Sequence, residues 1–527
     1  MRYSCRKLYD FSHSGSISLS DSSPVKAGGN ENLSFAEQDT VVMKWSILWR
    51  TLILSALGKT FYPYCRHLRD LDLRDLSDLL DRLDEGKYKT KVAKHFFAGD
   101  LERFHHTYQT KGKYRTTRLD VKSILVEVGD LLTQQAPMLE GVSEPMASEV
   151  IGLALPAWAP RLEHLLELEL WDGKALEDET LGNLVHAHCH KLQKLRIHHS
   201  SGMNSDHYLA NFINGMPPNT LVSFENMSSC RIATECCLAF NTHGRSLTTL
   251  KLALEEDGIL ALALLQNCTT IESLNIASLI PNSTDLKATQ NEAYLEIWEW
   301  LKRCDNLNHV SFQDVISAPD LLMPVLLNSK VQLSSLHVGA KEGALYQLNR
   351  HHDFHRALTQ QPTLDTLSLR ADPDPVTRDD QETVLDALCS LVNLRDLNLF
   401  RVSDYFSDQH VKALAQRLKN LESLYIGGYG VSDAVLDDLA GLPNLKMVNF
   451  AGITAFSVRG ILDFINKLGR GNAGLAFSVE MADPDSMISE DDQEHLRKAL
   501  YEKVGGRFDY QPLRGESTSI HGCHVVE

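Results

Sequence analysis

The stretch Leu394-Arg-Asp-Leu-Asn-Leu399 decides the fold, because its spacing of leucines, Leu-x-x-Leu-x-Leu, returns along the chain. Twelve copies or close aliphatic variants occur, and from Leu165 onward successive copies begin 24 to 36 residues apart. The copies begin at Leu68, Leu165, Leu192, Leu221, Leu247, Ile271, Leu307, Leu333, Leu364, Leu394, Leu421 and Leu445. A recurrence with this period indicates a protein built from one repeated structural unit.

Each unit is predicted to be a strand followed by a helix. The last two apolar positions of a copy are two residues apart, so both side chains point to one side of an extended strand. Helical spacing follows between copies, as in the stretch from Val411 to Leu418 ahead of Leu421. One such unit cannot bury its apolar side alone, but stacked units can. We therefore predict an α/β leucine-rich-repeat solenoid of about 12 to 13 repeats, with a parallel sheet on the concave face and helices on the convex face. The thirteenth repeat would begin at Leu139.

Four cysteines keep a fixed place in the repeat. Cys65, Cys189, Cys268 and Cys304 each stand three residues before the start of a copy. A residue held in phase with a repeat is a packing residue, and a free cysteine packs as a small hydrophobic group. These positions therefore predict buried thiols rather than redox or metal chemistry.

Composition excludes some classes of function. The 527 residues carry a formal charge of −17, which argues against a general binder of phosphate backbones, so nucleic acid is not an expected partner. The chain shows no signal-peptide core and no run of 18 apolar residues, so we expect no membrane partner. Ten cysteines without the spacing of a disulfide framework favour a cytoplasmic or nuclear protein, or one found in both compartments.

The repeats divide the chain into five regions. We expect residues 1–43, rich in Ser, Gly and Asn, to be disordered. The apolar segment and first repeat occupy 44–75, a mostly helical insertion 76–118, the solenoid 119–470, and a capping helix with a loose tail 471–527. The apolar positions of the insertion have helical spacing, which favours a solvated helix face over a binding patch for its charged residues; these positions are Val92, Phe96, Phe97, Leu101 and Phe104.

Catalytic and metal-binding patterns are weak. The sequence His186-Ala-His-Cys-His190 is the most metal-like cluster, but Cys189 has the packing phase of the repeat and should point inward. Nucleophile-elbow, phosphate-loop and dinucleotide-binding patterns are missing from the sequence. We therefore expect a protein that is not an enzyme, with no cofactor and no metal.

The outward-facing positions of the strands are the candidate binding residues. Large aromatic and charged side chains at these positions are typical of protein contact sites. The alternative is that they cover neighbouring side chains or a crossing segment. The predicted protein-binding residues of the concave face are Trp171, Arg196, His198, His309, His337, Arg370, Phe400 and Tyr425.

Two features resemble the leucine-rich region of fungal F-box proteins over residues 45–470. They are the segment SILWRTLILSALGKTFYPYCRHLRDLDLRDL, residues 46–76, and the in-phase Cys-x-x-Leu-x-x-Leu-x-Leu units. The resemblance implies that residues 44–75 contain an F-box-like remnant, with Trp49 and Leu52 belonging to the part that binds a Skp adaptor. No Leu-Pro-x-Glu opening or full helical F-box precedes Trp45, so the F-box itself is truncated or not recognisable.

Three functions follow as hypotheses. The first is a non-catalytic substrate receptor of a cullin-type (SCF) ubiquitin ligase, which holds a protein substrate on the concave face and reaches the cullin through the Skp adaptor. The second is a leucine-rich-repeat scaffold that binds a protein without any link to ubiquitin. The third is a GTPase-activating protein of the Ran type, for which the sequence offers no charged catalytic constellation.

Overall fold

The computed structural model describes residues 35–111, 115–200, 202, 204–228, 230–279, 285–339, 346–372, 376–483 and 487–512. The disorder expected for residues 1–34 and the loose tail expected beyond residue 512 lie outside the described residues. The chain divides into two compact units, Met1–Ala261 and Leu262–Glu527, called here the first and second units.

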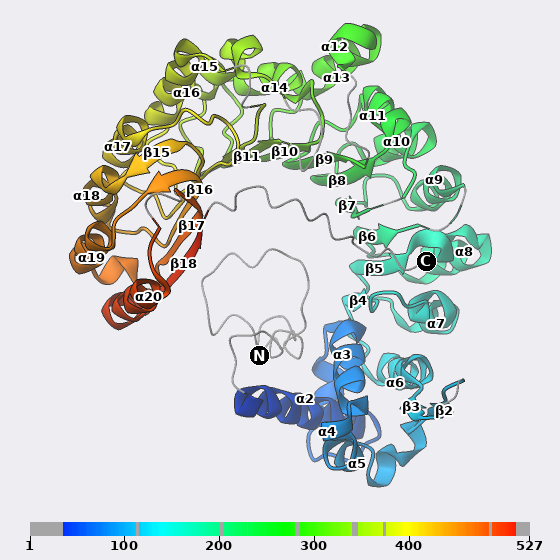
Figure 1. The fold of residues 1–527 in the computed structure, drawn as a ribbon. Helices are drawn as coiled ribbons and strands as arrows, with labels where there is room; N and C mark the ends of the chain where they lie inside the picture. Colours follow the sequence, from blue (N-terminus) through cyan, green and yellow to red (C-terminus); the bar gives the residue numbers. More distant parts are fainter. Residues whose placement is uncertain are drawn as a thin grey trace. The chain divides into compact units, whose positions relative to one another are not determined.

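The first unit contains a parallel sheet with helices on one side of it. Its strands, in sheet order, are β1 (Asp70–Asp72), β4 (Gly141–Ser143), β5 (Glu167–Asp172), β6 (Lys194–His199), β7 (Ser223–Asn226) and β8 (Thr249–Leu254). The helices that follow these strands are α3 (Leu73–Asp84), α7 (Val150–Trp158), α8 (Glu179–His188), α9 (Ser205–Gly215), α10 (Thr234–Phe240) and α11 (Glu256–Ala261), and α6 (Val121–Gln135) precedes β4. Within this unit the strands line the inner side of the curve and the helices the outer side (Figure 1).

The second unit repeats the same two layers. Its strands, in sheet order, are β9 (Ser273–Ser278), β10 (His309–Gln313), β11 (Ser335–Gly339), β12 (Thr366–Leu369), β13 (Asp396–Leu399), β14 (Ser423–Ile426), β16 (Met447–Ala455), β17 (Ala476–Ala482) and β18 (Arg507–Pro512), while β15 (Tyr429–Ser432) pairs beside β16. The outer layer holds α12 (Leu286–Thr289), α13 (Asn291–Lys302), α14 (Ala318–Leu326), α15 (His352–Leu358), α16 (Arg378–Ser390), α17 (Asp408–Arg417), α18 (Leu436–Ala440), α19 (Val458–Lys467) and α20 (Glu490–Val504).

The strand register confirms the predicted leucine-rich-repeat solenoid. A strand begins two residues after the start of every copy, including the one at Leu139. The central apolar residues of four copies, Leu336, Leu367, Leu397 and Leu424, pair in succession across β11 to β14. Each is at most 1% exposed, so the leucines form a continuous ladder between the strand and helix layers. Burial of one such side chain contributes roughly 1.5 to 3 kcal/mol.

A second ladder joins successive repeats just before each strand. The predicted in-phase cysteines are all buried, and the Cys189 and Cys304 thiols donate to Ala159 O (3.9 Å) and Cys268 O (3.7 Å) of the preceding repeat. Burial raises the pKa of Cys189, Cys268 and Cys304 to about 12, so these thiols stay protonated packing groups. Later repeats place an amide at the same point, where Gln361 Nε2 donates to Leu326 O (2.9 Å).

The sheet extends beyond the predicted end of the solenoid. Residues 471–527 are expected to hold only a capping helix and a loose tail, yet β17 and β18 add two parallel strands to β16. Helix α20 lies between them in the chain as the helix of a repeat. In the strand register, Gly474 and Gly505 stand where the other copies begin with a leucine, which is why the pattern misses both strands.

The region before the solenoid also differs from its predicted boundaries. Helix α2 spans Phe35–Ala56, so it begins within the segment 1–43 that is expected to be disordered. The insertion is helical through α4 (Gly86–Lys89), α5 (Val92–Phe96) and the 3-10 helix η3 (Gly99–Phe104), and then forms an antiparallel hairpin of β2 (Thr107–Gln109) and β3 (Thr117–Leu119). Over the described ranges no helix combines the length and apolar character needed to cross a bilayer.

Replacement of Phe477 by Ala tests whether β17 belongs to the core. Phe477 is 1% exposed and its ring lies 5.4 Å from that of Phe464 and 5.8 Å from that of Phe508. We expect the free energy of unfolding to fall by about 3 to 5 kcal/mol, because the change leaves a void between strands and helices. Urea-induced unfolding measures this loss. The control Tyr501→Ala, at a side chain 70% exposed on α20, should change stability little, and equal losses in the two variants would contradict the assignment.

Candidate protein-binding surface

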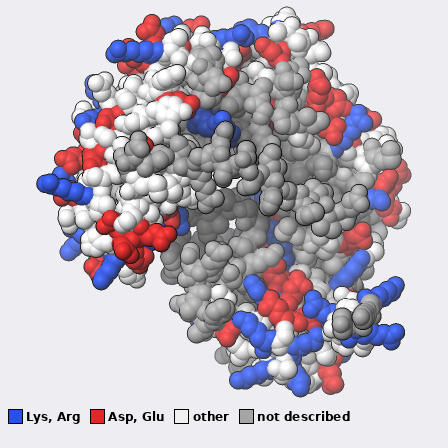
Figure 2. Space-filling model, in the orientation of Figure 1, with Lys and Arg blue, Asp and Glu red and all other residues white. Residues whose placement is uncertain are grey.

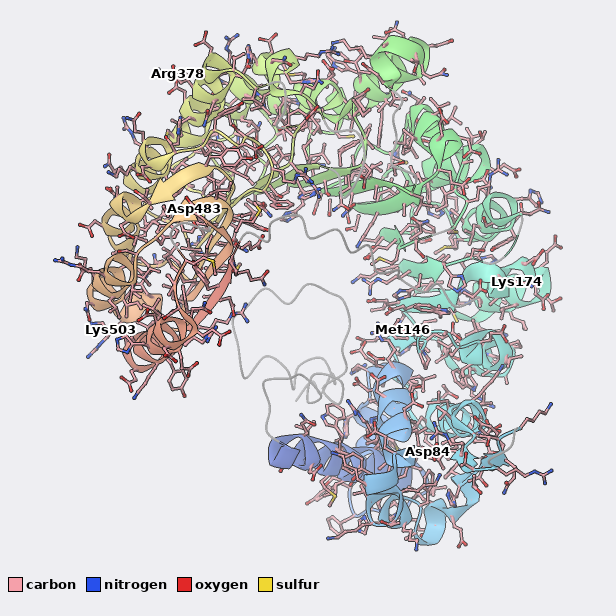
Figure 3. The ribbon with its side chains drawn as sticks, viewed as in Figure 1. Asp84, Met146, Lys174, Arg378, Asp483 and Lys503 are labelled. Carbon is pink, nitrogen blue, oxygen red and sulfur yellow. The ribbon has the colours of Figure 1, made fainter. Side chains whose placement is uncertain are left out.

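The eight predicted binding residues fall into two groups. Trp171 lies on β5, and Arg196 and His198 lie on β6 of the first unit. In the second unit, His309 and His337 lie on β10 and β11, Arg370 and Phe400 directly follow β12 and β13, and Tyr425 lies on β14. His309 is exposed and the other seven are partly buried. Figure 3 shows the side chains that extend from the strands of the two units.

In the first unit, the charged residues pair with one another. This charged cluster consists of Arg74, Glu169, Arg196, His198 and Glu225. Arg74 Nη1 lies 2.7 Å from Glu169 Oε1, and His198 Nε2 lies 2.8 Å from the same oxygen. Arg196 donates to Glu225 through Nε (3.1 Å) and Nη2 (3.0 Å). Both guanidinium groups are thus already neutralised within the molecule, which limits what they offer a partner.

Glu169 is the centre of the charged cluster. Its side chain is 1% exposed. Burial alone would raise the pKa of Glu169, but the hydrogen bond from His198 and the charges of Arg74 and Arg196 lower it to about 2. The carboxylate therefore stays ionised and fixes three side chains in place, Arg74 from the start of α3 and Arg196 and His198 from β6.

Trp171 covers the same cluster. Its ring stacks on His198 with a centroid distance of 5.2 Å and meets His199 edge-on at 5.4 Å. Its backbone N–H donates to Glu144 Oε2 (2.8 Å). Burial raises the pKa of Glu144 to about 7, although hydrogen bonds from the Ile151 and Trp171 backbone oppose the shift. The predicted residues of the first unit are thus brought together, but largely by contacts with one another.

In the second unit, three predicted residues form a row across neighbouring strands. The Arg370 guanidinium lies 5.1 Å from the centroid of the Phe400 ring, and that ring lies 5.1 Å from the ring of Tyr425. Tyr425 Oη donates to Glu480 on β17 (3.0 Å to Oε1), and Asn449 Nδ2 on β16 donates to the same oxygen (2.7 Å). We call these five residues the aromatic row. Each is partly exposed.

The aromatic row keeps its donor and acceptor roles fixed. Burial raises the pKa of Tyr425, and the negative charge of Glu480 raises it further. The phenol therefore remains a protonated donor to the carboxylate. Asn449 and Glu480 were not identified from sequence. Glu480 lies on a strand that the leucine pattern misses. Asn449 lies at an outward position of the last copy of the pattern, so the pattern alone could have identified it.

His309 and His337, the predicted histidines of the second unit, do not join the aromatic row. His309 pairs in register with Ser335, and His337 pairs with Ser311 and Ser368. His309 Nδ1 lies 3.3 Å from Ser334 Oγ at the edge of the sheet. Burial lowers the pKa of His337, so this ring is neutral at physiological pH.

Trp49 and Leu52, the expected adaptor-binding residues, are buried. Trp49 is 2% exposed and Leu52 is 8% exposed. Helix α2 turns them toward its neighbours, which include α3, α5 and α6. Neither side chain can reach a partner in this conformation, so the assignment of these two residues to an adaptor surface is wrong. Among the side chains of this helix that the structure describes, Met43 and Ile47 are exposed large apolar residues, at 39% and 52%.

Within the histidine cluster near Cys189, His186 has a packing role. The ring of His186 lies 4.8 Å from that of Phe212, and burial lowers the pKa of this histidine. Among the described residues, no group of three His, Cys, Asp or Glu side chains has the arrangement of a metal site.

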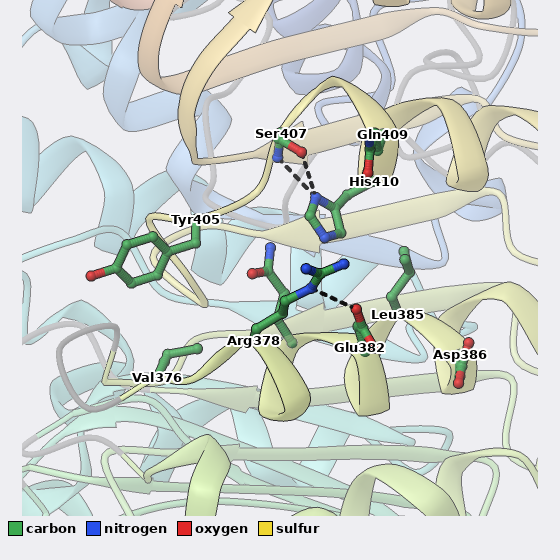
Figure 4. A pocket seen from close by; sticks show the side chains of 10 residues that line it. Val376, Arg378, Glu382, Leu385, Asp386, Tyr405, Ser407, Gln409 and His410 are labelled. Atoms are coloured by element: carbon green, nitrogen blue, oxygen red, sulfur yellow. Dashed lines mark hydrogen bonds and ion pairs between the residues drawn. The ribbon is translucent and has the colours of Figure 1, made fainter.

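A groove of 710 Å³ lies between the first turns of α16 and α17 (Figure 4). Its lining includes an ion pair, Arg378 Nε to Glu382 Oε1 at 2.9 Å, and a serine beside a histidine, Ser407 Oγ to His410 Nδ1 at 2.9 Å. The Ser407 backbone N–H donates to the same nitrogen (3.0 Å), so the pair is a helix cap at the start of α17. A serine held in this way does not have the arrangement of a catalytic nucleophile with a free base.

Comparison with known proteins finds only distant similarity. No family model and no curated protein matches the sequence. Among solved structures, the chain is similar to one titled as the complex of Rad7 and Elc1 in yeast, at 12% identity and a TM-score of 0.40, over 86% of this chain and 92% of that one. It is also similar to a structure of a TLR13–ssRNA13 complex, at 11% identity and a TM-score of 0.31, over 72% of this chain and 60% of that one. Similarities this weak carry no information about function.

Replacement of Glu169 by Gln tests the charged cluster. We expect the free energy of unfolding near neutral pH to fall by about 3 kcal/mol, because an amide cannot compensate Arg74 and Arg196. The pKa of Glu169 is lower in the folded protein (about 2) than the ordinary value of 4.5, so its contribution is present above pH 4.5 and is lost as pH falls toward 2. Urea-induced unfolding of wild type and variant should therefore converge below about pH 4.5.

The exposed Glu163 provides the matched control for this experiment. The Glu163→Gln variant should unfold like wild type at every pH. A stability difference for Glu169→Gln that stays constant down to about pH 2 would contradict the assigned role.

Proposed function

We propose that this chain is a non-catalytic protein-binding subunit that holds its partner on the inner face of the second unit, through the aromatic row. The observation that carries the proposal is the stack of Tyr425 on β14 with Phe400 and Arg370, which directly follow the neighbouring strands β13 and β12. Arginine and aromatic residues supply much of the binding energy at protein interfaces. Tyr425 lies on a strand and Arg370 and Phe400 come directly after strands, and side chains held by a rigid element lose less entropy on binding.

The aromatic row is better prepared for a partner than the charged cluster. Arg196 and Glu169 already satisfy one another in the first unit. The rings of Phe400 and Tyr425 remain partly exposed, and Glu480 fixes the orientation of the phenol. A partner that covers these rings gains apolar burial.

The charges along the aromatic row suggest the direction of the bound segment. Arg370 stands at the β12 end and Glu480 at the β17 end. A segment that crosses the strands would place a carboxylate near Arg370, an apolar or aromatic side chain over Phe400 and a hydrogen-bond donor near Glu480. This order of groups distinguishes one peptide sequence from another and so gives specificity.

The more specific form of the proposal is a substrate receptor of a cullin-type ubiquitin ligase, acting in the cytoplasm or nucleus. It rests on the resemblance of residues 46–76 to fungal F-box proteins. Because Trp49 and Leu52 are buried, a Skp adaptor would have to use the exposed side of α2, which carries Met43 and Ile47. Affinity capture that recovers the partner without a Skp adaptor or cullin would leave a ubiquitin-independent scaffold as the function.

Replacement of Phe400 by Ala tests the aromatic row. We expect affinity for the partner to fall about tenfold or more, because the ring is the central apolar group of the row. The midpoint of thermal unfolding should change little, since the ring is partly exposed and the leucine ladder is untouched. Quantitative affinity capture from cell extract, with purified partner in a second step, measures the loss.

The matched control is Tyr405→Ala, which removes a ring that is 59% exposed outside the aromatic row. This variant should bind the partner like wild type. Equal capture by the Phe400 variant and wild type would exclude the aromatic row as the binding surface.

A further inference from the structure

The insertion before the solenoid concentrates positive charge in an acidic protein. Residues 86–122 carry ten Lys or Arg against three Asp or Glu, although the net charge of the chain is −17. Figure 2 shows blue side chains around the part of the first unit that Figure 1 labels β2 and β3. A partner with negative charge is therefore drawn to this part of the surface more than to the rest.

A pocket of 450 Å³ lies at the centre of this region. It is enclosed by the end of α3, by α4 and α5, by η3 and by the β2–β3 hairpin. Buried apolar side chains form its floor, namely Leu83, Ala93, Phe97 and Leu119. A pocket of this size and lining accepts a large apolar side chain.

Cations stand at the rim of the pocket in fixed positions. Asp84, which is 8% exposed, holds Lys89 Nζ at 2.8 Å and Arg118 Nε at 2.9 Å (Figure 3 labels Asp84). Lys89 also donates to the backbone oxygen of Thr117. One buried carboxylate thus positions two cations, whose own side chains remain 42% and 52% exposed.

A third cation is free for a ligand. Lys94 is exposed, lines the pocket and makes no hydrogen bond or ion pair within the described part of the chain. Glu102 is the one carboxylate among the exposed lining residues, so positive charge prevails at the rim.

We infer that this pocket binds an acidic peptide segment of a partner protein, with one apolar side chain in the pocket and flanking carboxylates at Lys89, Lys94 and Arg118. Charge complementarity selects an anionic partner, and the apolar floor selects a peptide over nucleic acid. The Phe97 ring is 4% exposed and already stacks on His105 at 4.6 Å, so it offers no open face to a base. The site is separate from the aromatic row, so either can fail without the other.

Fluorescence polarisation with the full chain tests the inference. The probe is a labelled acidic peptide with two large apolar residues at its centre, EDELFDED. The control peptide EDEAADED has the same charge but carries two alanines at these positions. We expect EDELFDED to bind about tenfold more tightly, because only its apolar side chains can fill the pocket. Equal binding of the two peptides, or no detectable binding of EDELFDED at about 1 mM, would overturn the inference.

Two variants locate the binding at this pocket. Lys94→Glu reverses the free cation, and Ala98→Trp at an exposed lining residue fills the pocket without disturbing the buried floor. Each should weaken EDELFDED binding about five- to tenfold. Lys503→Glu makes the same charge change at an exposed position of α20 and should leave binding unchanged. Thermal unfolding of all three variants verifies that they fold.

Oligothymidylate serves as a polyanion that has no apolar side chain. It should bind more weakly than EDELFDED at the same salt concentration. Tighter binding of oligothymidylate that depends on Lys94 would mean a nucleic-acid site and would overturn the assignment to a peptide. Unchanged affinity of EDELFDED for both pocket variants would overturn it as well.

Discussion

The structure depends on one constraint: no repeat can bury its own apolar face. Each strand satisfies its backbone groups by pairing with the strands of neighbouring repeats, and the leucines of each strand are sealed only when the adjacent helix layer is in place. The succession Leu336, Leu367, Leu397 and Leu424 shows the result, a line of side chains with almost no exposure. Buried polar groups such as Gln361 reinforce it by bonding a carbonyl of the preceding repeat. The register between neighbouring strands therefore determines both how the leucines pack and which side chains lie on the surface.

The same register presents the outward side chains in rows. Because alternate residues of a strand point to opposite faces, every leucine turned inward fixes a neighbour turned outward. The two units use these rows differently. In the first unit, Glu169 draws Arg74, Arg196 and His198 into a closed set of ion pairs. In the second unit, Arg370 and the rings of Phe400 and Tyr425 form a stack whose members are all partly exposed. The proposed partner site follows from this difference.

The insertion obeys other rules. Short helices and an antiparallel hairpin replace the strand–helix repeat between α3 and α6, and the surface there is basic. Asp84 shows how such a surface is organised, since a single carboxylate with little exposure holds Lys89 and Arg118 over an apolar floor. Two lysines of a run that the sequence presents as a solvated helix face, Lys89 and Lys94, line a pocket in three dimensions.

The sequence by itself determined the repeats, their strands and the set of outward-facing strand residues that contains Phe400 and Tyr425. The alternation of side chains along a strand and the recurrence of the leucine pattern along the chain can both be read from the order of the residues alone. The sequence did not reveal β17 and β18, where Gly474 and Gly505 replace the first leucine of the pattern. Tertiary structure alone decided that Trp49 is buried, that Glu480 meets Tyr425 from 55 residues away, and that Asp84 gathers the cations of the insertion. Each of these outcomes depends on side chains brought together from separate elements, and spacing within one element cannot specify such a contact.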